Sequence, residues 1–185
     1  MFLYKCLGWC TTLLIMCSFP VSAESLSAQR IEQWLEAAPV VQDWSKRNLQ
    51  YQRKDQHSSD ITQISEVFTE QVNDSGDSSD QLTKALQPYG FKDVKAWSDT
   101  FERIMLAMGA LQLKQNNVES TLRAALQQLE KDANIPAGTR DRLIQEYQAM
   151  LSTIETLKGV PDADIAAVEP FEPQLRAWLN SAKPK

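Results

Sequence analysis

The stretch from Asp93 to Gln115 constrains the fold of this chain more than any other, because its apolar residues recur at steps of three and four. This spacing places side chains on one face of an α-helix and does not fit the alternation of a strand. The sequence therefore predicts a long amphipathic helix against which other helices pack. The residues on its apolar stripe are Val94, Trp97, Phe101, Ile104, Met108 and Leu111, with Met105 widening the stripe.

The first 23 residues have the parts of a secretory signal peptide. Lys5 is the only charge before an apolar run that is too short to span a bilayer, and a Val-x-Ala sequence ends at Ala23. We expect cleavage after Ala23 and a periplasmic or secreted mature protein. Lipoprotein anchoring at Cys17 is the less favoured alternative, because Met16 stands where such signals carry Gly, Ala or Ser. An uncleaved membrane anchor is weaker still.

Cysteine and charge exclude several classes of function for the mature chain. Cys6, Cys10 and Cys17 all precede the predicted cleavage site, which leaves no disulfide or thiolate metal site. The net charge of -5 disfavours nucleic acid and anionic lipid as partners. No second apolar run approaches spanning length, so we expect a soluble mature chain without stable membrane insertion.

The rest of the chain predicts an all-α fold, a single domain over residues 24–185. Helical stripes run through 27–53, where Pro39 indicates a kink or a break, and through 118–129 and 143–157. Breaks at Asn116 and Pro136 favour an irregular antiparallel bundle of about five to seven helices over a coiled coil. We expect polar loops near 51–60 and 73–80.

Catalytic and metal-binding motifs are not found in the sequence. His57, the only histidine, lies in the polar segment at 51–60, and the run of Asp74, Asp77 and Asp80 does not match a calcium-binding loop. A positioned base for a nucleophile is therefore not predicted. We expect a non-enzymatic protein without cofactor or metal, and a carboxylate-based enzyme stays open as an alternative.

Large side chains at helical spacing offer the only candidate binding surface. Most of them fit the interpretation that they fill the core, and aromatic residues are also favoured at binding hot spots. The leading hypothesis is a binding or accessory module whose partner is another envelope protein, and the alternative is a carrier of an apolar small molecule inside the bundle. The oligomeric state stays open. The candidate residues for a partner or pocket surface are Trp34, Trp44, Trp97, Met105, Met108 and Trp178.

Three segments carry a resemblance to a known group of proteins: PYGFKDVKAW from Pro88, NIPAGTRDRL from Asn134, and LKGVPDADIAAVEPFEPQLRAWL from Leu157. In these segments the chain resembles small all-helical exported proteins of Gram-negative bacteria that carry no assigned activity. The resemblance covers about residues 88–179, and it rests on helix boundaries. It implies an all-helical periplasmic protein and transfers no functional residue.

Overall fold

The computed structural model describes residues 25–48, 63–132 and 134–181. Within these ranges the regular structure is entirely helical, which confirms the predicted all-α helical bundle. Two short 3₁₀ turns, Gln87–Tyr89 and Glu169–Phe171, continue α3 and α7. The α-helices are α1 (Ala28–Asn48), α2 (Ile64–Asn73), α3 (Asp77–Leu86), α4 (Val94–Gln115), α5 (Val118–Lys131), α6 (Ala137–Lys158), α7 (Asp162–Val168) and α8 (Glu172–Ser181).

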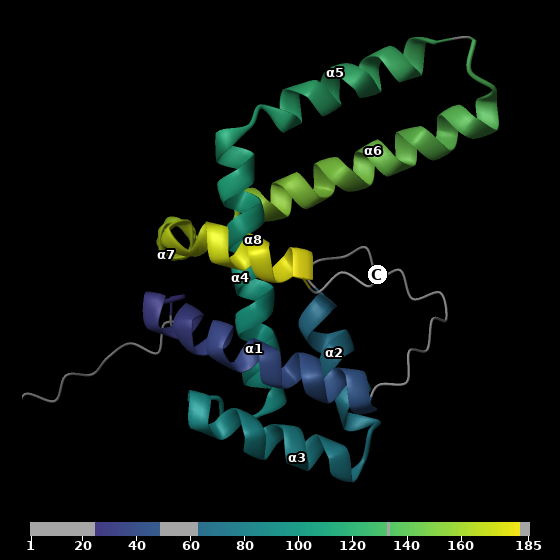
Figure 1. Ribbon diagram of the computed structural model, residues 1–185. Helices are drawn as coiled ribbons and strands as arrows, with labels where there is room; N and C mark the ends of the chain where they lie inside the picture. Colours follow the sequence, from purple (N-terminus) through teal and green to yellow (C-terminus); the bar gives the residue numbers. More distant parts are fainter. Residues whose placement is uncertain (1–24, 49–62, 133, 182–185) are drawn as a thin grey trace, which may run out of the picture.

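Helix α4 is the central element, as its spacing predicts. It runs through the middle of the molecule, with α1, α2 and α3 around one half and α7 and α8 near its middle (Figure 1). The helix begins after Asp93, whose side chain accepts a hydrogen bond from the backbone N–H of Ala96 at 2.6 Å. This N-cap satisfies one of the free donors of the first turn. The predicted stripe is buried at Val94, Trp97, Ile104, Met108 and Leu111.

Helix α1 continues through Pro39, so of the two predicted forms the single helix is observed. Pro39 is exposed, whereas Ala38 beside it is buried against the core. The loss of one backbone hydrogen bond to proline is therefore offset by packing on the opposite side of the helix. The predicted extension from 49 to 53 lies outside the described residues.

The predicted polar loop at 73–80 is wrong in its length. Only Asp74, Ser75 and Gly76 separate α2 from α3, and Gly76 turns the chain with a φ of +60°. Asp77 and Asp80 lie in the first turn of α3, where negative side chains favour the helix dipole. A run of Asp and Ser that resembles a loop in sequence is thus a helix start. The predicted loop at 51–60 and His57 lie outside the described residues.

Helices α5 and α6 form an antiparallel hairpin that projects from the top of α4 (Figure 1). We call residues 118–158 the arm. Two cross-helix ion pairs, Glu119–Lys158 and Arg123–Glu155, show the antiparallel register at the base of the arm. The base is joined to the body by Leu157, which packs against the core and approaches Gly109 of α4.

One hydrophobic cluster holds the body together, and its members come from α1, α2, α3, α4, α7 and α8. Among the described residues of the arm, only Leu129 and Ile154 are buried, and neither belongs to this cluster. Along the described part of the chain, no helix combines the length and apolar character that crossing a membrane requires. The predicted signal peptide and the last four residues lie outside the described residues.

Candidate functional site

The aromatic residues selected from the sequence meet at the centre of the body. Trp34 of α1 stacks on Trp97 of α4 with ring centroids 5.4 Å apart, and on Phe101 at 5.2 Å. Trp178 of α8 meets Trp34 edge-on at 4.8 Å. These separations are those of rings in direct contact, so the four side chains fill the space between the helices.

Three indole N–H groups in this aromatic cluster have no hydrogen-bond acceptor among the described residues. They belong to Trp34, Trp97 and Trp178, and all three nitrogen atoms are buried. A buried indole N–H is usually paired. Trp178 meets Trp34 and Phe101 at interplanar angles of 77° and 73°, the geometry in which an aromatic edge faces a ring. The cluster therefore contains three indole N–H groups that donate no hydrogen bond to a described residue.

The remaining residues of the predicted surface are also largely covered. Trp44 is buried and donates its indole N–H to the backbone oxygen of Ser78 at 3.0 Å, which joins α1 to α3. Met108 is buried, and Met105 and Trp178 are half-buried. The structure thus brings Trp34, Trp97 and Trp178 together, places Trp44 and Met108 elsewhere in the core, and leaves Met105 half-buried outside the core cluster.

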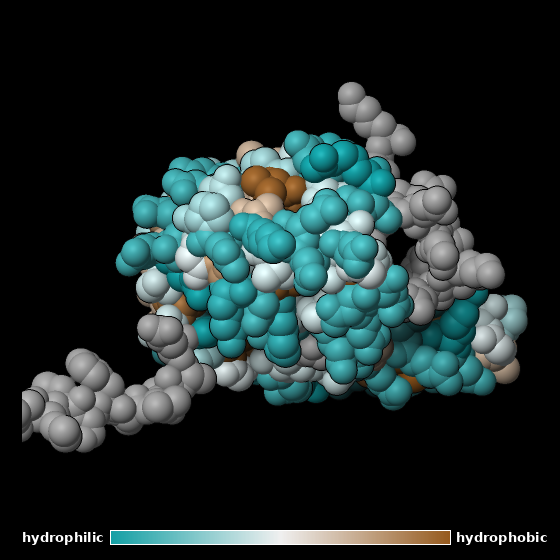
Figure 2. Space-filling view, turned by 90° about the horizontal axis from the view of Figure 1, so that it is seen from below, coloured by the Kyte–Doolittle hydropathy of each residue, from teal (hydrophilic) through white to brown (hydrophobic). Residues whose placement is uncertain are grey.

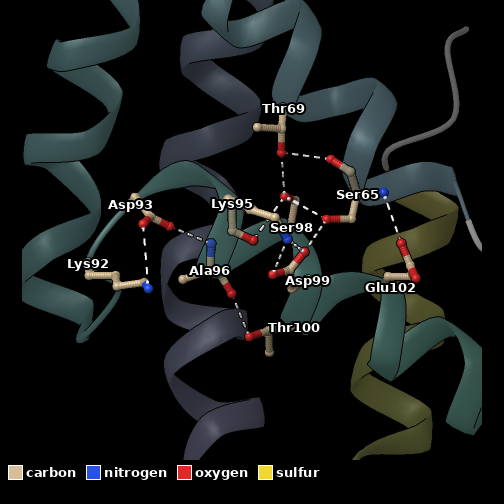
Figure 3. A network of polar contacts seen from close by, with 10 residues as sticks. All are labelled: Ser65, Thr69, Lys92, Asp93, Lys95, Ala96, Ser98, Asp99, Thr100 and Glu102. Carbon is tan, nitrogen blue, oxygen red and sulfur yellow. Dashed lines mark hydrogen bonds and ion pairs between the residues drawn. The ribbon is translucent and has the colours of Figure 1, made fainter. Parts of the chain in front are cut away.

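A network of hydroxyl and charged side chains joins α2 to α4 (Figure 3). Ser65 donates its hydroxyl to Asp99 at 2.5 Å, and Thr69 donates to the backbone oxygen of Ser65 at 2.7 Å. The hydroxyl oxygen of Ser98 lies 3.1 Å from that of Ser65 and 3.0 Å from that of Thr69. Each hydroxyl has one proton, and Ser98 also donates to the backbone oxygen of Lys95 at 3.1 Å. The three hydroxyl groups therefore form one cluster that offers more acceptors than it has protons.

The chemistry of this network is that of a helix-to-helix contact. Ser65 and Ser98 are both buried, which removes them from a substrate in solvent. Lys95, whose Nζ lies 2.7 Å from Asp99, has its pKa raised chiefly by that hydrogen bond. It is an ammonium at neutral pH and cannot accept the proton of a nucleophile.

Glu102 extends the network to the start of α2. Its carboxylate accepts the backbone N–H of Ser65 at 3.2 Å. Gln63, the residue at the N-cap of α2, makes no side-chain cap hydrogen bond. A carboxylate at this position satisfies a free donor and interacts favourably with the helix dipole. Helix α4 thereby supplies the cap that the α2 sequence lacks.

The arm presents the least covered apolar surface among the described helices. Val118 and Met150 are the large hydrophobic residues classed as exposed, at 43% and 49%. The other apolar residues on its two stripes are only half-buried, apart from Leu129 and Ile154: Leu122, Ala125, Leu126, Leu143, Ile144, Tyr147 and Leu151. By contrast, the face seen from below in Figure 2 is mostly hydrophilic, with brown confined to small areas. Among the described helices, α5 and α6 of the arm thus have an apolar face that other helices do not fully cover.

Sequence reasoning did not select these arm residues as a site. Their helical spacing is visible, and it predicts a buried face. Which residues cover that face depends on how the hairpin projects from the body, and the spacing of apolar residues in the sequence does not give this information.

Within the described residues, no group of three or more His, Cys, Asp or Glu side chains is placed to hold a metal ion.

The fold and site together define an all-α helical body with a projecting two-helix arm. No model of a known protein family matches the chain, and no curated protein or solved structure matches it.

Proposed function

We propose that the protein is a non-enzymatic periplasmic binding or accessory module, and that the arm is its binding element. The observation that supports this proposal is the half-exposed apolar stripe of α5 and α6, with Met150 at 49% exposure. The stripe lies on a projecting hairpin and not over the core. Apolar helix faces that a chain leaves uncovered are typical of partner binding.

The energetics of a two-helix hairpin support the same proposal. Isolated helices of fewer than about 12–15 residues are marginal in water, and most helix stability in proteins comes from packing. Helix α5 has 14 residues and packs chiefly on α6, with Leu129 as its one buried residue. Partner binding would supply the burial that the hairpin lacks.

Site-specific photo-crosslinking in the native host tests the binding function. A photoreactive amino acid at Met150 is compared with one at the neighbouring Ala149, which is also exposed and lies more than a quarter-turn away on α6. We expect a discrete crosslinked species from position 150 that is much weaker from position 149. Equal or no crosslinking at the two positions would contradict the assignment of the arm.

Export is tested by the mass of the protein that the host makes. The proposed location requires a product that begins at Glu24, because the predicted cleavage follows Ala23. Intact-mass measurement should give residues 24–185. A mass that retains residues 1–23, or one that shows an acyl chain on Cys17, would contradict it.

A carrier of an apolar small molecule is the second candidate, favoured by the three buried indole N–H groups without an acceptor. An apolar ligand with one acceptor atom would use this donor capacity, provided that the rings of Trp34, Trp97 and Trp178 separate. Native mass spectrometry of gently purified protein is the test. A lipophilic adduct that is lost on Trp34→Phe would support the carrier, and an adduct-free spectrum would count against it.

A further inference from the structure

We propose that the occupant of the exposed side of the arm is a second copy of this chain, so that two arms pack into an antiparallel four-helix bundle. This inference rests on the proposed function, since it names the partner of the same surface. Three properties of the arm support it: the side on which its uncovered residues fall, the size of that side, and its charge.

The two exposed large hydrophobic residues of the arm, Val118 and Met150, share one side of the hairpin with a half-buried residue on each helix. Val118 is seven residues from the half-buried Ala125 on α5, and Met150 is seven residues from the half-buried Leu143 on α6. Seven residues are close to two helical turns, so each pair points in nearly one direction. Because α5 and α6 are antiparallel, helical geometry brings the two pairs to the same side. This spacing is that of a helix-packing seam.

The size of this side reaches the lower end of what a specific dimer needs. Helix α6 has 22 residues and α5 has 14, so they are about 33 Å and about 21 Å long at about 1.5 Å per residue. Two helices at a spacing of about 8–10 Å present a surface about 20 Å wide. The side therefore covers on the order of 500 Å² in projection, and two such sides give about 1,000 Å², the lower end of specific interfaces. A two-fold arrangement would pair this side with itself.

Charge permits two arms to meet although the chain as a whole is acidic. The chain has a net charge of -5, whereas residues 118–158 carry five basic and six acidic side chains. At the base of the arm, Lys158 lies 2.7 Å from Glu119, and Arg123 lies 2.8 Å from the same carboxylate. Arg142 and Glu146 lie 3.8 Å apart on α6. A second arm thus meets a nearly neutral surface on which several charges are already paired, and like-charge repulsion is small.

Sedimentation velocity of the full-length gene product, purified in the form that the host makes, tests the inference over about 1–100 µM, a range that spans typical weak to tight dimers. We expect dimers. Met150→Glu should raise the dimer dissociation constant at least about tenfold, because it places a charge in an apolar interface. Ala149→Glu adds the same charge to the same helix and should leave the dissociation constant within about twofold. Circular dichroism of each variant establishes that it is folded.

A monomer at every concentration, or a dimer that Met150→Glu and Ala149→Glu weaken equally, would overturn the second copy as the occupant. The crosslinking experiment separates this failure from that of the proposed function. A crosslink from position 150 at twice the mass of the chain supports the inference. A crosslink to a different protein overturns the inference while the binding function stands, and no specific crosslink contradicts both.

Discussion

The carboxylate of Asp164 accepts a hydrogen bond from the backbone N–H of Leu26 at 2.8 Å, which joins α7 to the segment before α1. Asp164 is buried, and Arg103 of α4 lies 2.8 Å from its other oxygen. One side chain thereby connects three parts of the body. If the predicted cleavage after Ala23 occurs, Leu26 is the third residue of the mature chain, and its buried side chain anchors the new N-terminus.

Replacing Asp164 should therefore destabilise the protein substantially. Asp164→Ala leaves the Leu26 N–H without its acceptor and removes a charged partner of Arg103, and we expect a loss of about 2–3 kcal/mol in the free energy of unfolding. Asp162→Ala is the matched control on the same helix, because the Asp162 side chain is 90% exposed. It should cost much less than Asp164→Ala. Similar losses for the two variants in denaturant titration would contradict this role of Asp164.

Trp97 should be among the most costly residues to truncate. It is buried between Trp34 and Phe68, with ring centroids at 5.4 and 5.7 Å. Trp97→Ala creates a large cavity beside these rings, and we expect a loss of about 3–5 kcal/mol. Trp97→Phe keeps an aromatic ring and should cost less. A loss below about 1 kcal/mol for Trp97→Ala in urea unfolding is incompatible with α4 as the central element.

Gly109 lets Leu157 approach α4 at the base of the arm. A Cβ atom at position 109 would lie 2.9 Å from Cδ2 of Leu157, which is closer than such atoms pack. Glycine inside a helix costs about 1 kcal/mol relative to alanine, so Gly109→Ala should stabilise α4 unless this contact opposes it. A double-mutant cycle of Gly109→Ala with Leu157→Ala measures how far this contact reduces the gain in stability.

In that cycle, Gly109→Ala should raise stability by about 1 kcal/mol when Leu157→Ala is already present, and by less, or with reversed sign, in the native background. The measurement is chemical unfolding of the four proteins. An equal change in the free energy of unfolding in both backgrounds would show that the arm does not pack on α4 through Leu157.

The arm should lose stability as pH falls below the ordinary range of glutamate titration. Lys158 and Arg123 lower the pKa of Glu119 from about 4.5, with the Lys158 hydrogen bond the largest cause. Because the pKa of the folded state is the lower one, the contribution of Glu119 is present above the unfolded pKa and is lost as pH falls through the folded value. An NMR titration should show a Glu119 pKa below 4.5 that returns upward in Lys158→Met. An unchanged pKa in that variant would contradict the ion pair.

The fold was predictable where periodicity and helix ends carry the information. The stripe from Val94 to Leu111 predicts α4, and the predicted breaks at Asn116 and Pro136 lie at the C-cap of α4 and the N-cap of α6. The loop near 73–80 was predicted too long because a run of Asp and Ser favours loops in sequence, although it also suits a first helical turn. The period of a helix shows which face is apolar.

The sites were less predictable, because they depend on which helices meet. Ser65 and Asp99 are 34 positions apart, and neither has a local signal for their hydrogen bond. The aromatic cluster was visible as large residues, but the meeting of Trp34 with Trp178 is set by the packing of α1 and α8. The exposure of Met150 follows from the departure of the arm from the body. Helical spacing alone would have placed Met150 in a core.

We propose that the chain alone does not fully stabilise its arm, and that binding a partner completes the packing of α5 and α6. Backbone hydrogen exchange, measured residue by residue on the purified protein from dilute to concentrated samples, tests this proposal. We predict that in dilute solution the amides of α5 and α6 exchange at least about tenfold faster than those of α1 and α4, and that their protection rises as the protein is concentrated and arms associate. Arm amides as protected as those of α4 at the lowest concentration would show that the arm is stable by itself and would contradict the account.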